Sequence, residues 1–413
     1  MTRHERTVDV LIVGAGPAGL GAAAELAASG VRRVEVLERE QTAGGIPRHC
    51  HHAGFGSSRS SRGTDGPEYA RRCTAAATRA GATLRTGITV TGWSGPLTLD
   101  ATGPGGLERI TAHAVVLATG ARERPRGARL VPGTRPAGVY TTGELQQAVH
   151  VHHQHIGTRA VIIGDEPVSI AAAGTLHAAG VDVVARVTDR PPAIPAALGP
   201  RHGAPLLTRT TVTALTGRGR LTGVTVRHQD GRTTTLPCDT VVFTGDWIPD
   251  HELARRGDVP LDPGTRGPAH DAAFRTGSPG VFAAGNLLHA VESAGTAAAE
   301  GRALAAPVRR HLTTGPATGS WPSGRLALTV AAPLEWIAPN LLCPEGARPA
   351  HNRFTLRTVR PLTAPLLVVR QDGRVLYRRR LLRPVRPGRP FPLAADWIDR
   401  ADPLGGTVCV SAG

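Results

Sequence analysis

Three glycines and one carboxylate near the N-terminus form a pattern that can bind a dinucleotide. Gly14, Gly16 and Gly19 follow an apolar run, and Glu38 closes the next apolar run, 24 residues after Gly14 (38 − 14). In such a turn the first glycine permits a tight strand-to-helix connection, the second lets the backbone approach a pyrophosphate, and the third lets helix and strand pack closely. The phosphates then meet N–H groups at the positive end of a helix. Glu38 favours a ribose with a free 2′-hydroxyl.

Two further strand ends indicate which dinucleotide this is. Thr119 and Gly120 follow the apolar run 115–118, and Gly285 and Asn286 follow the run 281–284. A helical pattern begins near Ser293. In open α/β sheets, ligands bind beyond the carboxyl ends of strands. Three such ends, widely spread in sequence, fit one long extended ligand better than a nicotinamide cofactor on a single βαβ unit.

Taken together, these motifs resemble the flavoproteins with two dinucleotide-binding domains, the pyridine nucleotide-disulfide oxidoreductase superfamily. The segments that carry this resemblance are residues 14–19, 117–125 and 280–286, within a similar region of about residues 7–312. Three more segments are similar to one branch, the FAD subunits of hydrogen cyanide synthase, opine oxidase and related amino-acid or amine dehydrogenase complexes. They are residues 44–50, 140–147 and 285–289.

The resemblance implies FAD as the cofactor and assigns it a set of residues. These are Gly14, Gly16, Pro17, Ala18, Gly19, Glu38, Arg39, Gly45, Thr119, Gly120, Gly285 and Asn286. The superfamily usually has Asp where this chain has Asn286, but an amide can still hydrogen-bond a ribityl hydroxyl. The N-terminus of the helix beginning near Ser293 is expected to face the flavin pyrimidine and to stabilise negative charge there.

His49 and Cys50 are the candidate catalytic residues. They follow the turn at Gly44 and Gly45, where the chain of the superfamily passes near the isoalloxazine ring. There they could shape the flavin edge, tune its potential or relay a proton near neutral pH. Packing in a polar loop explains the same residues equally well. No metal site is predicted, and the histidine-rich segment 150–155 is expected to be a solvated linker rather than a ligand set.

A second glycine turn departs from the dinucleotide-binding pattern. After the apolar strand 160–163 come Gly164, Glu166 and Ser169, so the last two replace the expected second and third glycines. Glu166 puts a negative charge where a pyrophosphate would lie, and Coulomb repulsion opposes its binding. Arg186 could accept a 2′-phosphate, although a solvated surface arginine is the simpler interpretation. Binding of NAD(P) is therefore uncertain, and the domain is expected to serve as architecture or as a partner surface.

Composition narrows the class of protein. The net charge is +16, and all 48 basic residues are arginine, which excludes Schiff-base chemistry on lysine. A coding bias toward arginine is preferred over an anionic partner, because the arginines look scattered and no nucleic-acid motif accompanies them. The five cysteines are isolated from one another, so neither a dithiol relay nor an iron–sulfur cluster is expected. Single thiols fit a cytoplasmic location, and no apolar stretch is long enough for a transmembrane helix.

The predicted fold is α/β, with a doubly wound FAD domain, an inserted second Rossmann-like domain and a small C-terminal antiparallel β domain. Strands are expected in this last domain at residues 326–330, 353–358, 366–370, 375–379 and 408–410, with a hairpin turn at Asp372–Gly373. Pro307, Pro316 and Pro322 suggest a polar linker before it. The predicted domain ranges are 1–150 and 266–312 for FAD, 156–265 for the insertion and 325–413 for the β domain.

Three functions remain open on this basis. The first is an FAD-dependent, electron-transferring subunit of a heteromeric amino-acid, opine or amine dehydrogenase. Its partners would be a small-molecule substrate, an amino-acid-oxidase-like flavoprotein and a small ferredoxin-like subunit, with no nucleic acid. The second is a stand-alone NAD(P)H-dependent flavin reductase. The third is a non-catalytic scaffold that keeps the flavoprotein fold.

Overall fold

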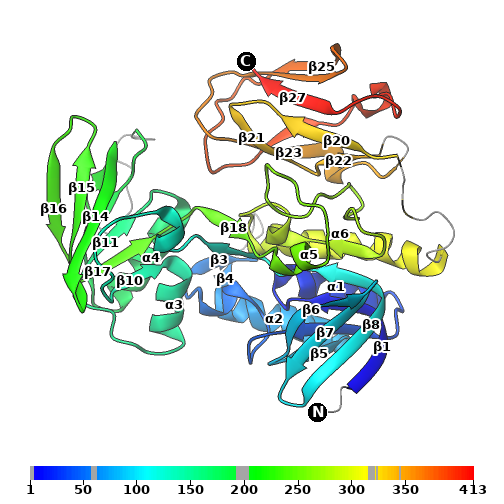
Figure 1. The fold of residues 1–413 in the computed structure, drawn as a ribbon, viewed down its shortest axis with the longest axis horizontal. Helices are drawn as coiled ribbons and strands as arrows, with labels where there is room; N and C mark the ends of the chain where they lie inside the picture. Colours follow the sequence, from blue (N-terminus) through cyan, green and yellow to red (C-terminus); the bar gives the residue numbers. More distant parts are fainter. Residues whose placement is uncertain (1–3, 57–62, 192–203, 315–320, 322–323, 344–345) are drawn as a thin grey trace. The chain divides into compact units, whose positions relative to one another are not determined.

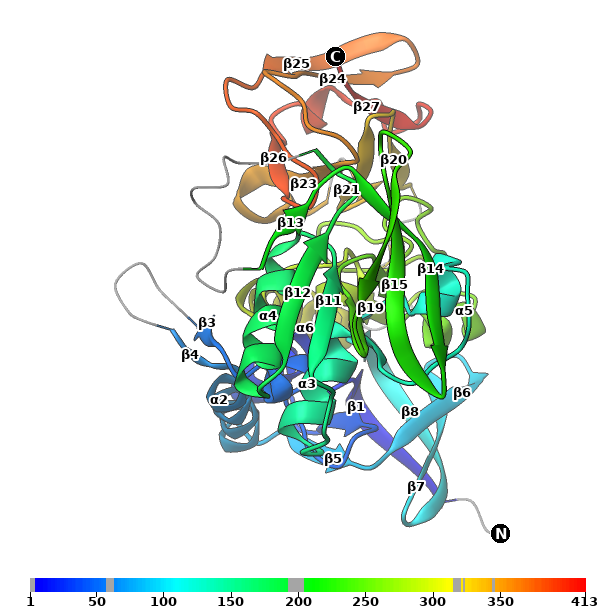
Figure 2. The same cartoon turned by 90° about the vertical axis from the view of Figure 1, so that its left-hand side faces the viewer.

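The chain folds into two compact units. The structure is a computed structural model that describes residues 4–56, 63–191, 204–314, 321, 324–343 and 346–413 (Figures 1 and 2). The first unit comprises residues 1–45, 70–121 and 249–413, and the second comprises residues 46–69 and 122–248. Within the described residues, no helix combines the length and apolar composition that a membrane crossing needs.

A seven-stranded sheet forms the centre of the first unit, in the order β5-β2-β1-β8-β7-β6, with β19 also paired to β8. The strands are β1 (His4–Val13), β2 (Val34–Glu38), β5 (Thr83–Thr86), β6 (Thr89–Gly95), β7 (Thr98–Gly103), β8 (Gly106–Leu117) and β19 (Val281–Ala283). The helices of this part are α1 (Pro17–Ala28), α5 (Glu252–Arg256), α6 (Ala294–Thr314) and, from residue 70 on, α2 (Gly66–Arg79). β1, β2, β5, β8 and β19 run parallel, whereas β6 and β7 pair antiparallel.

Both faces of this sheet are buried, which explains the continuous apolar runs in the sequence. Val10 and Ile12 of β1 join the core that includes α1 and α6, whereas Leu11 and Val13 join the core on the other face. Successive side chains of a strand point to opposite faces, so a strand covered on both sides needs apolar residues at every position.

The second unit contains another parallel sheet, in the order β10-β17-β11-β12-β13. Its strands are β10 (Val139–Thr141), β11 (Arg159–Ile163), β12 (Asp182–Val187), β13 (Leu206–Leu207) and β17 (Thr240–Phe243), with helices α3 (Thr142–His150) and α4 (Pro167–Ala178). An antiparallel sheet follows, made of β14 (Thr210–Arg218), β15 (Arg220–His228) and β16 (Thr233–Pro237). Two short pairs are β3 (Ala53–Phe55) with β4 (Thr64–Asp65), and β9 (Ala121–Glu123) with β18 (Trp247–Pro249).

The C-terminal part of the first unit is built from two small sheets around one apolar core. The strands are β20 (Leu326–Val330), β21 (Leu334–Ala338), β22 (Leu341–Leu342), β23 (Arg353–Thr358), β24 (Leu366–Gln371), β25 (Arg374–Arg380), β26 (Phe391–Ala394) and β27 (Val408–Ala412). All five predicted strands are present, and Asp372 and Gly373 both have positive φ in the turn between β24 and β25. One pair, β20 with β27, is parallel.

The predicted fold class is confirmed, and one element boundary was wrong. Pro307 was expected to open a linker, but α6 runs through it to Thr314. A proline inside a helix removes one hydrogen bond. Val308 next to it is fully buried in the core, so tertiary packing holds the helix together here. Pro316 and Pro322 lie outside the described residues. The four predicted domain ranges stay a prediction.

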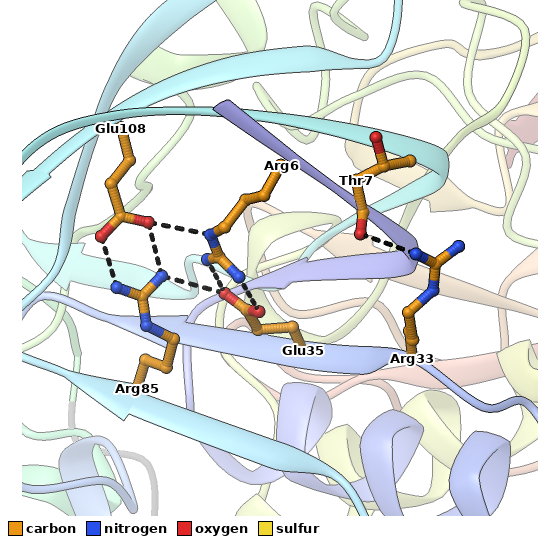
Figure 3. Close-up of polar contacts among 6 residues, drawn as sticks. All are labelled: Arg6, Thr7, Arg33, Glu35, Arg85 and Glu108. Atoms are coloured by element: carbon orange, nitrogen blue, oxygen red, sulfur yellow. Dashed lines mark hydrogen bonds and ion pairs between the residues drawn. The ribbon is translucent and has the colours of Figure 1, made fainter. Parts of the chain in front are cut away.

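Four charged side chains connect four neighbouring strands of the large sheet (Figure 3). Arg6 on β1 contacts Glu35 on β2 and donates to Glu108 on β8 at 3.0 Å. Arg85 on β5 donates to Glu108 at 2.7 Å and to Glu35 at 3.2 Å. Both carboxylates are buried, and hydrogen bonds from Arg85 and Arg6 lower the pKa of Glu108 to about 2. The network thus satisfies two charges that could not be buried alone.

We expect Glu108→Gln to destabilise the protein by about 3 kcal/mol, because it leaves two arginines to share one buried carboxylate. Because the pKa of Glu108 is depressed in the folded state, its contribution is present above about pH 4.5 and is lost as the pH falls through about 2. Urea denaturation at pH 7 measures the decrease in the free energy of unfolding. The control is Asp100→Asn, which breaks the more exposed Arg109–Asp100 pair and should cost less than about 1 kcal/mol. Equal losses in the two variants would contradict a structural role for the network.

Candidate functional site

Gly14 makes the turn between β1 and α1 possible. Its φ is +104°, and its N–H donates to the carbonyl oxygen of Leu37 at 2.9 Å. A Cβ atom at this position would lie 2.4 Å from the carbonyl oxygen of Ala118. The backbone of the second predicted segment, which continues into Thr119 and Gly120, is therefore in contact with the first glycine of the turn.

Gly16 is the N-cap of α1 and faces open space. No atom lies within 4 Å of a Cβ placed on it, and no side chain caps the helix. Pro17, Ala18 and Gly19 form the first turn, so the N–H groups of Ala18 and Gly19 remain directed at this opening. Gly45 lies against the turn, since a Cβ on it would be 2.8 Å from the Cα of Gly16. An uncapped helix N-terminus beside open space fits a pyrophosphate.

The Glu38 carboxylate lies at the same turn. It accepts the N–H of Ala15 at 2.9 Å and the N–H of Glu40 at 3.0 Å. These two bonds hold the carboxylate at the end of β2, where a ribose could reach it. Arg39, next along the chain, is mostly exposed and forms an ion pair with Asp250 at 3.5 Å.

Thr119 and Gly120 are held in place by hydrogen bonds to Asp250, which lies where the chain re-enters the first unit. The hydroxyl of Thr119 donates to the carbonyl oxygen of Asp250 at 2.7 Å, and the N–H of Asp250 donates to the carbonyl oxygen of Gly120 at 2.9 Å. A Cβ on Gly120 would meet nothing within 4 Å. The turn after β8 is therefore held on one side and open on the other.

Gly285 and Asn286 complete the set of strand ends. A Cβ on Gly285 would lie 2.6 Å from the Cβ of Ala18, which places the end of β19 against the first turn of α1. The side chain of Asn286 is used within the chain: its oxygen accepts the N–H of Glu292 at 2.7 Å, and its amide donates to the carbonyl oxygen of Glu292 at 3.3 Å. An aspartate could not make the second bond, which gives the departure from the superfamily a local reason.

Glu300 and His289 are functional candidates that the sequence analysis missed. Glu300, on α6, accepts the N–H of Gly285 at 3.0 Å and forms an ion pair with His289 at 2.9 Å. Burial alone lowers the pKa of His289, but the Glu300 carboxylate reverses this and the pKa is raised. The same contact lowers the pKa of Glu300 against the effect of burial. Glu300 thus positions the turn at Gly285. No motif in the sequence around Glu300 indicates this role.

His49 and Cys50 lie together in the second unit and are both buried. Burial, with the nearby charge of Glu123, raises the pKa of the Cys50 thiol to about 12, and the thiol donates to Gln146 at 3.3 Å. A neutral, hydrogen-bonded thiol is a poor nucleophile. Burial lowers the pKa of His49 to about 4, and neither ring nitrogen has a hydrogen-bond partner among the described residues. A buried imidazole without a hydrogen-bond partner is unusual, because most buried polar groups in proteins are hydrogen-bonded.

Glu123 is a third residue that the sequence analysis missed, although it lies in the segment 117–125 that carries the family resemblance. Its carboxylate is buried and accepts the N–H of Gly143, near the start of α3, at 2.9 Å. Burial raises the pKa of Glu123 to about 7, against the opposing hydrogen bond from the N–H of Gly143. A carboxyl group that titrates near neutral pH can exchange a proton at physiological pH.

Helix α3 begins with a capping box, in which the side chains of Thr141 and Glu144 hydrogen-bond each other's backbone N–H groups.

The second glycine turn is occupied by its own glutamate. Glu166 accepts from the hydroxyl of Thr244 at 3.0 Å, and a Cβ on Gly164 would lie 2.5 Å from its carboxylate oxygen. Arg190 approaches the same carboxylate at 3.8 Å. The residues at this turn do not fit the pyrophosphate of a second dinucleotide. Arg186 is buried on β12, which corrects its interpretation as a solvated surface residue. Its neighbours Ala185 and Val187 on the other face of the strand are buried too, so both faces of the sheet are covered at this end of β12.

A sequence model of the pyridine nucleotide-disulphide oxidoreductases matches residues 8–301. The chain belongs to this family. It is an FAD-dependent oxidoreductase, and membership of the family implies binding of FAD and NAD(P). The open turn at Gly16 fits the pyrophosphate of FAD. At the second glycine turn, the Glu166 carboxylate occupies the place where the pyrophosphate of NAD(P) would bind.

Two curated proteins are similar to part of the chain. The alpha subunit of sarcosine oxidase from Rhizobium meliloti (strain 1021) is 33% identical over 156 residues, which are 38% of this chain and 15% of that protein. An opine oxidase subunit from Agrobacterium tumefaciens (strain Ach5) is 32% identical over 183 residues, which are 42% of this chain and 35% of that protein. The matches thus span about a third or less of these relatives.

Solved structures share the fold. Thioredoxin reductase of T. acidophilum is 25% identical, covers 73% of this chain and 97% of its own, and has a TM-score of 0.62. L-proline dehydrogenase of P. horikoshii is 18% identical, with 76% of this chain and 57% of its own covered and a TM-score of 0.57. The second likeness shows the fold alone.

Because a methyl group at Gly16 meets no protein atom, we expect Gly16→Ala to fold normally but to bind FAD less tightly, by about tenfold or more. The methyl would occupy the space that the pyrophosphate needs. The measurements are the flavin content of the purified protein and the FAD dissociation constant, with the melting temperature of the apoprotein as the test of folding. Gly92→Ala is the control, since Gly92 on β6 also faces open space. Unchanged FAD affinity in Gly16→Ala would exclude this turn as the pyrophosphate site.

Glu123→Gln is expected to flatten the pH dependence of stability. A carboxyl whose folded pKa is raised to about 7 contributes stability below about pH 4.5, and that contribution is lost as the pH rises to 7. Over this interval the wild type should lose about 3 kcal/mol that the variant keeps. Thermal unfolding of the FAD-loaded protein at pH 5 and pH 8 measures the difference, with the exposed Glu5→Gln as the control. Parallel pH profiles for the wild type and Glu123→Gln would exclude the raised pKa.

Proposed function

We propose that the chain is the electron-transferring FAD subunit of a heteromeric dehydrogenase that acts on an amino acid, an opine or an amine. The observation that carries this proposal is the Glu166 carboxylate over the second glycine turn, because it opposes the nicotinamide cofactor that would otherwise supply electrons. The two curated relatives support it, since each is named as a subunit of an oxidase.

In this proposal the chain binds one FAD through the residues around α1. The N–H groups of Ala18 and Gly19 bind the pyrophosphate at the open side of Gly16, and Glu38 binds the adenosine ribose. The ordered turns at Thr119–Gly120 and Gly285–Asn286 orient the rest of the molecule. Bound FAD supplies reversible transfer of electrons, and the protein supplies orientation and electrostatics.

Two groups of the second unit are proposed to serve proton exchange and ligand contact. Glu123 titrates near neutral pH, so it can hold or release a proton during turnover. His49 stays neutral and keeps two unpartnered ring nitrogens, one of which can donate while the other accepts. Cys50 positions Gln146 through its thiol, and because the thiol stays protonated near neutral pH, Cys50 is not the proton relay in this proposal.

The proposed partners are an amino-acid-oxidase-like flavoprotein that oxidises the small-molecule substrate and a small ferredoxin-like subunit. The five cysteines of this chain are isolated from one another in the sequence and form no CxxC motif, so the chain itself offers no dithiol pair for onward transfer. The second candidate function is a stand-alone NAD(P)H-dependent reductase. It is favoured by the family match, which runs through the whole second unit, and by the near-complete coverage of a thioredoxin reductase.

Anaerobic addition of substrates to the purified, FAD-loaded chain separates the two candidates. We expect neither NADH nor NADPH to bleach the flavin absorbance on the timescale of turnover, and an amino acid, opine or amine to bleach it only when the oxidase-like partner is co-purified. Glu166→Gly is the matched variant, because it removes the carboxylate from the second turn and should increase any reduction by NAD(P)H. Rapid bleaching of the wild type by NADH or NADPH would overturn the heteromeric proposal in favour of the reductase.

A further inference from the structure

Arginines are concentrated in one segment of the C-terminal β domain, which contains the β24–β25 hairpin. Residues 360–390 hold nine arginines and one acidic residue, Asp372, whereas the whole chain holds 48 in 413 residues. The density is therefore more than twice the average, and the arginines of the chain are not evenly scattered. All nine are exposed. The result is a strongly positive surface that a general bias toward arginine does not by itself produce.

Strand β25, which carries much of this charge, lies at the edge of its sheet. The strand order is β22-β20-β27-β24-β25, so β25 pairs with β24 on one side and with no described strand on the other (Figure 2). The N–H of Leu381 donates to Pro365 of the β24 side at 2.9 Å. Because the N–H groups of a paired strand alternate in direction, those of Arg380 and Arg378 point away from β24. The edge thus offers backbone hydrogen-bonding groups beside guanidinium groups.

In the other sheet of this domain, the edge strand β26 is protected by proline. Its strand order is β21-β23-β26, and the edge strand β26 contains Pro392 and follows Pro390. Proline cannot donate a backbone hydrogen bond, so these two residues protect β26 from a further strand. The segment Arg374–Arg380 of β25 has no proline. Its protection is charge alone, which repels a second basic strand but not an acidic one.

A hollow opens between the two edge strands. Leu367, Tyr377 and Leu381 line it from the β24–β25 hairpin, and Leu393 lines it from β26. Pro392 and Ala394 of β26 line it as well, together with one arginine from each sheet, Arg379 of β25 and Arg353 of β23. Because the lining combines apolar side chains with two arginines, the hollow suits a side chain with an aliphatic stem and a terminal carboxylate.

We propose that β25 and the adjoining hollow bind an acidic, extended polypeptide segment of a partner protein, which adds to the sheet as a further strand. The open row of N–H and C=O groups selects a polypeptide, because a nucleic acid or a lipid headgroup cannot pair with it in register. The arginines select an acidic strand and discourage pairing between two copies of this chain. The proposal goes beyond the function proposed above, since it requires neither electron transfer nor any particular partner.

Fluorescence anisotropy of labelled peptides on the full-length, FAD-loaded chain tests this surface. The probe is a synthetic peptide of alternating Glu and Val, and its counterpart alternates Lys and Val. We expect only the acidic peptide to bind, and its affinity to fall with rising salt. Arg378→Glu combined with Arg380→Glu should weaken binding by about tenfold or more. Arg378→Pro keeps the pairing with β24 but removes one outward N–H, and it should weaken binding at low salt as well.

The control is Arg218→Glu combined with Arg227→Glu, which makes the same charge change at exposed positions of β14 and β15. It should leave peptide binding unchanged. Flavin content and melting temperature establish that each variant is folded. Three results would overturn the proposal: no binding of the acidic peptide, equal losses in the test and control pairs, or tighter binding of a DNA duplex or phosphatidylserine vesicles than of the peptide. None of these results depends on whether NAD(P)H reduces the flavin, so this proposal and the heteromeric function can fail separately.

Discussion

The parallel register of β1 with its neighbours is the constraint on which the cofactor site depends. β1 pairs with β2 on one side and with β8 on the other, and β8 pairs in turn with β19. Parallel strands in register end at the same edge, so Glu38, Thr119 and Gly285 are brought to the turn at Gly14 although they are far apart in the sequence. The contact between Gly14 and Ala118 is close enough that no side chain fits between them. A shift in register would separate all of these residues at once.

Buried charge has two different consequences in this molecule. In the network of Arg6, Glu35, Arg85 and Glu108, each carboxylate has arginine donors, and the pKa of Glu108 falls to about 2. Such groups keep their charge and stabilise the sheet. Glu123 has one backbone donor at its second oxygen and no partner at its first among the described residues, and its pKa rises to about 7. A buried carboxylate with so few hydrogen-bond donors lowers the stability of the fold. Carboxyl groups with strongly shifted pKa values are typical of functional sites.

The two glycine turns show how one change of residue alters the chemistry of a shared fold. Both turns follow a parallel strand and precede a helix with proline in its first turn. At the first, Gly16 leaves the helix N-terminus open. At the second, Glu166 stands in the equivalent place and its carboxylate lies over Gly164 and Gly245. The positive end of a helix attracts an anion in either case, and in the second turn the chain provides that anion itself.

Periodicity and glycine spacing determined the fold class, the buried parallel strands, the first glycine turn and five strands of the C-terminal domain, because these follow from interactions within a few residues. The same local reasoning was wrong at Pro307, where the buried Val308 and its neighbours keep α6 intact. Only the tertiary structure decided that Cys50 is buried and neutral, that Glu300 supports Gly285, and that Glu123 titrates near pH 7. Burial and electrostatic environment arise from residues distant in the chain, so no short sequence pattern can specify them.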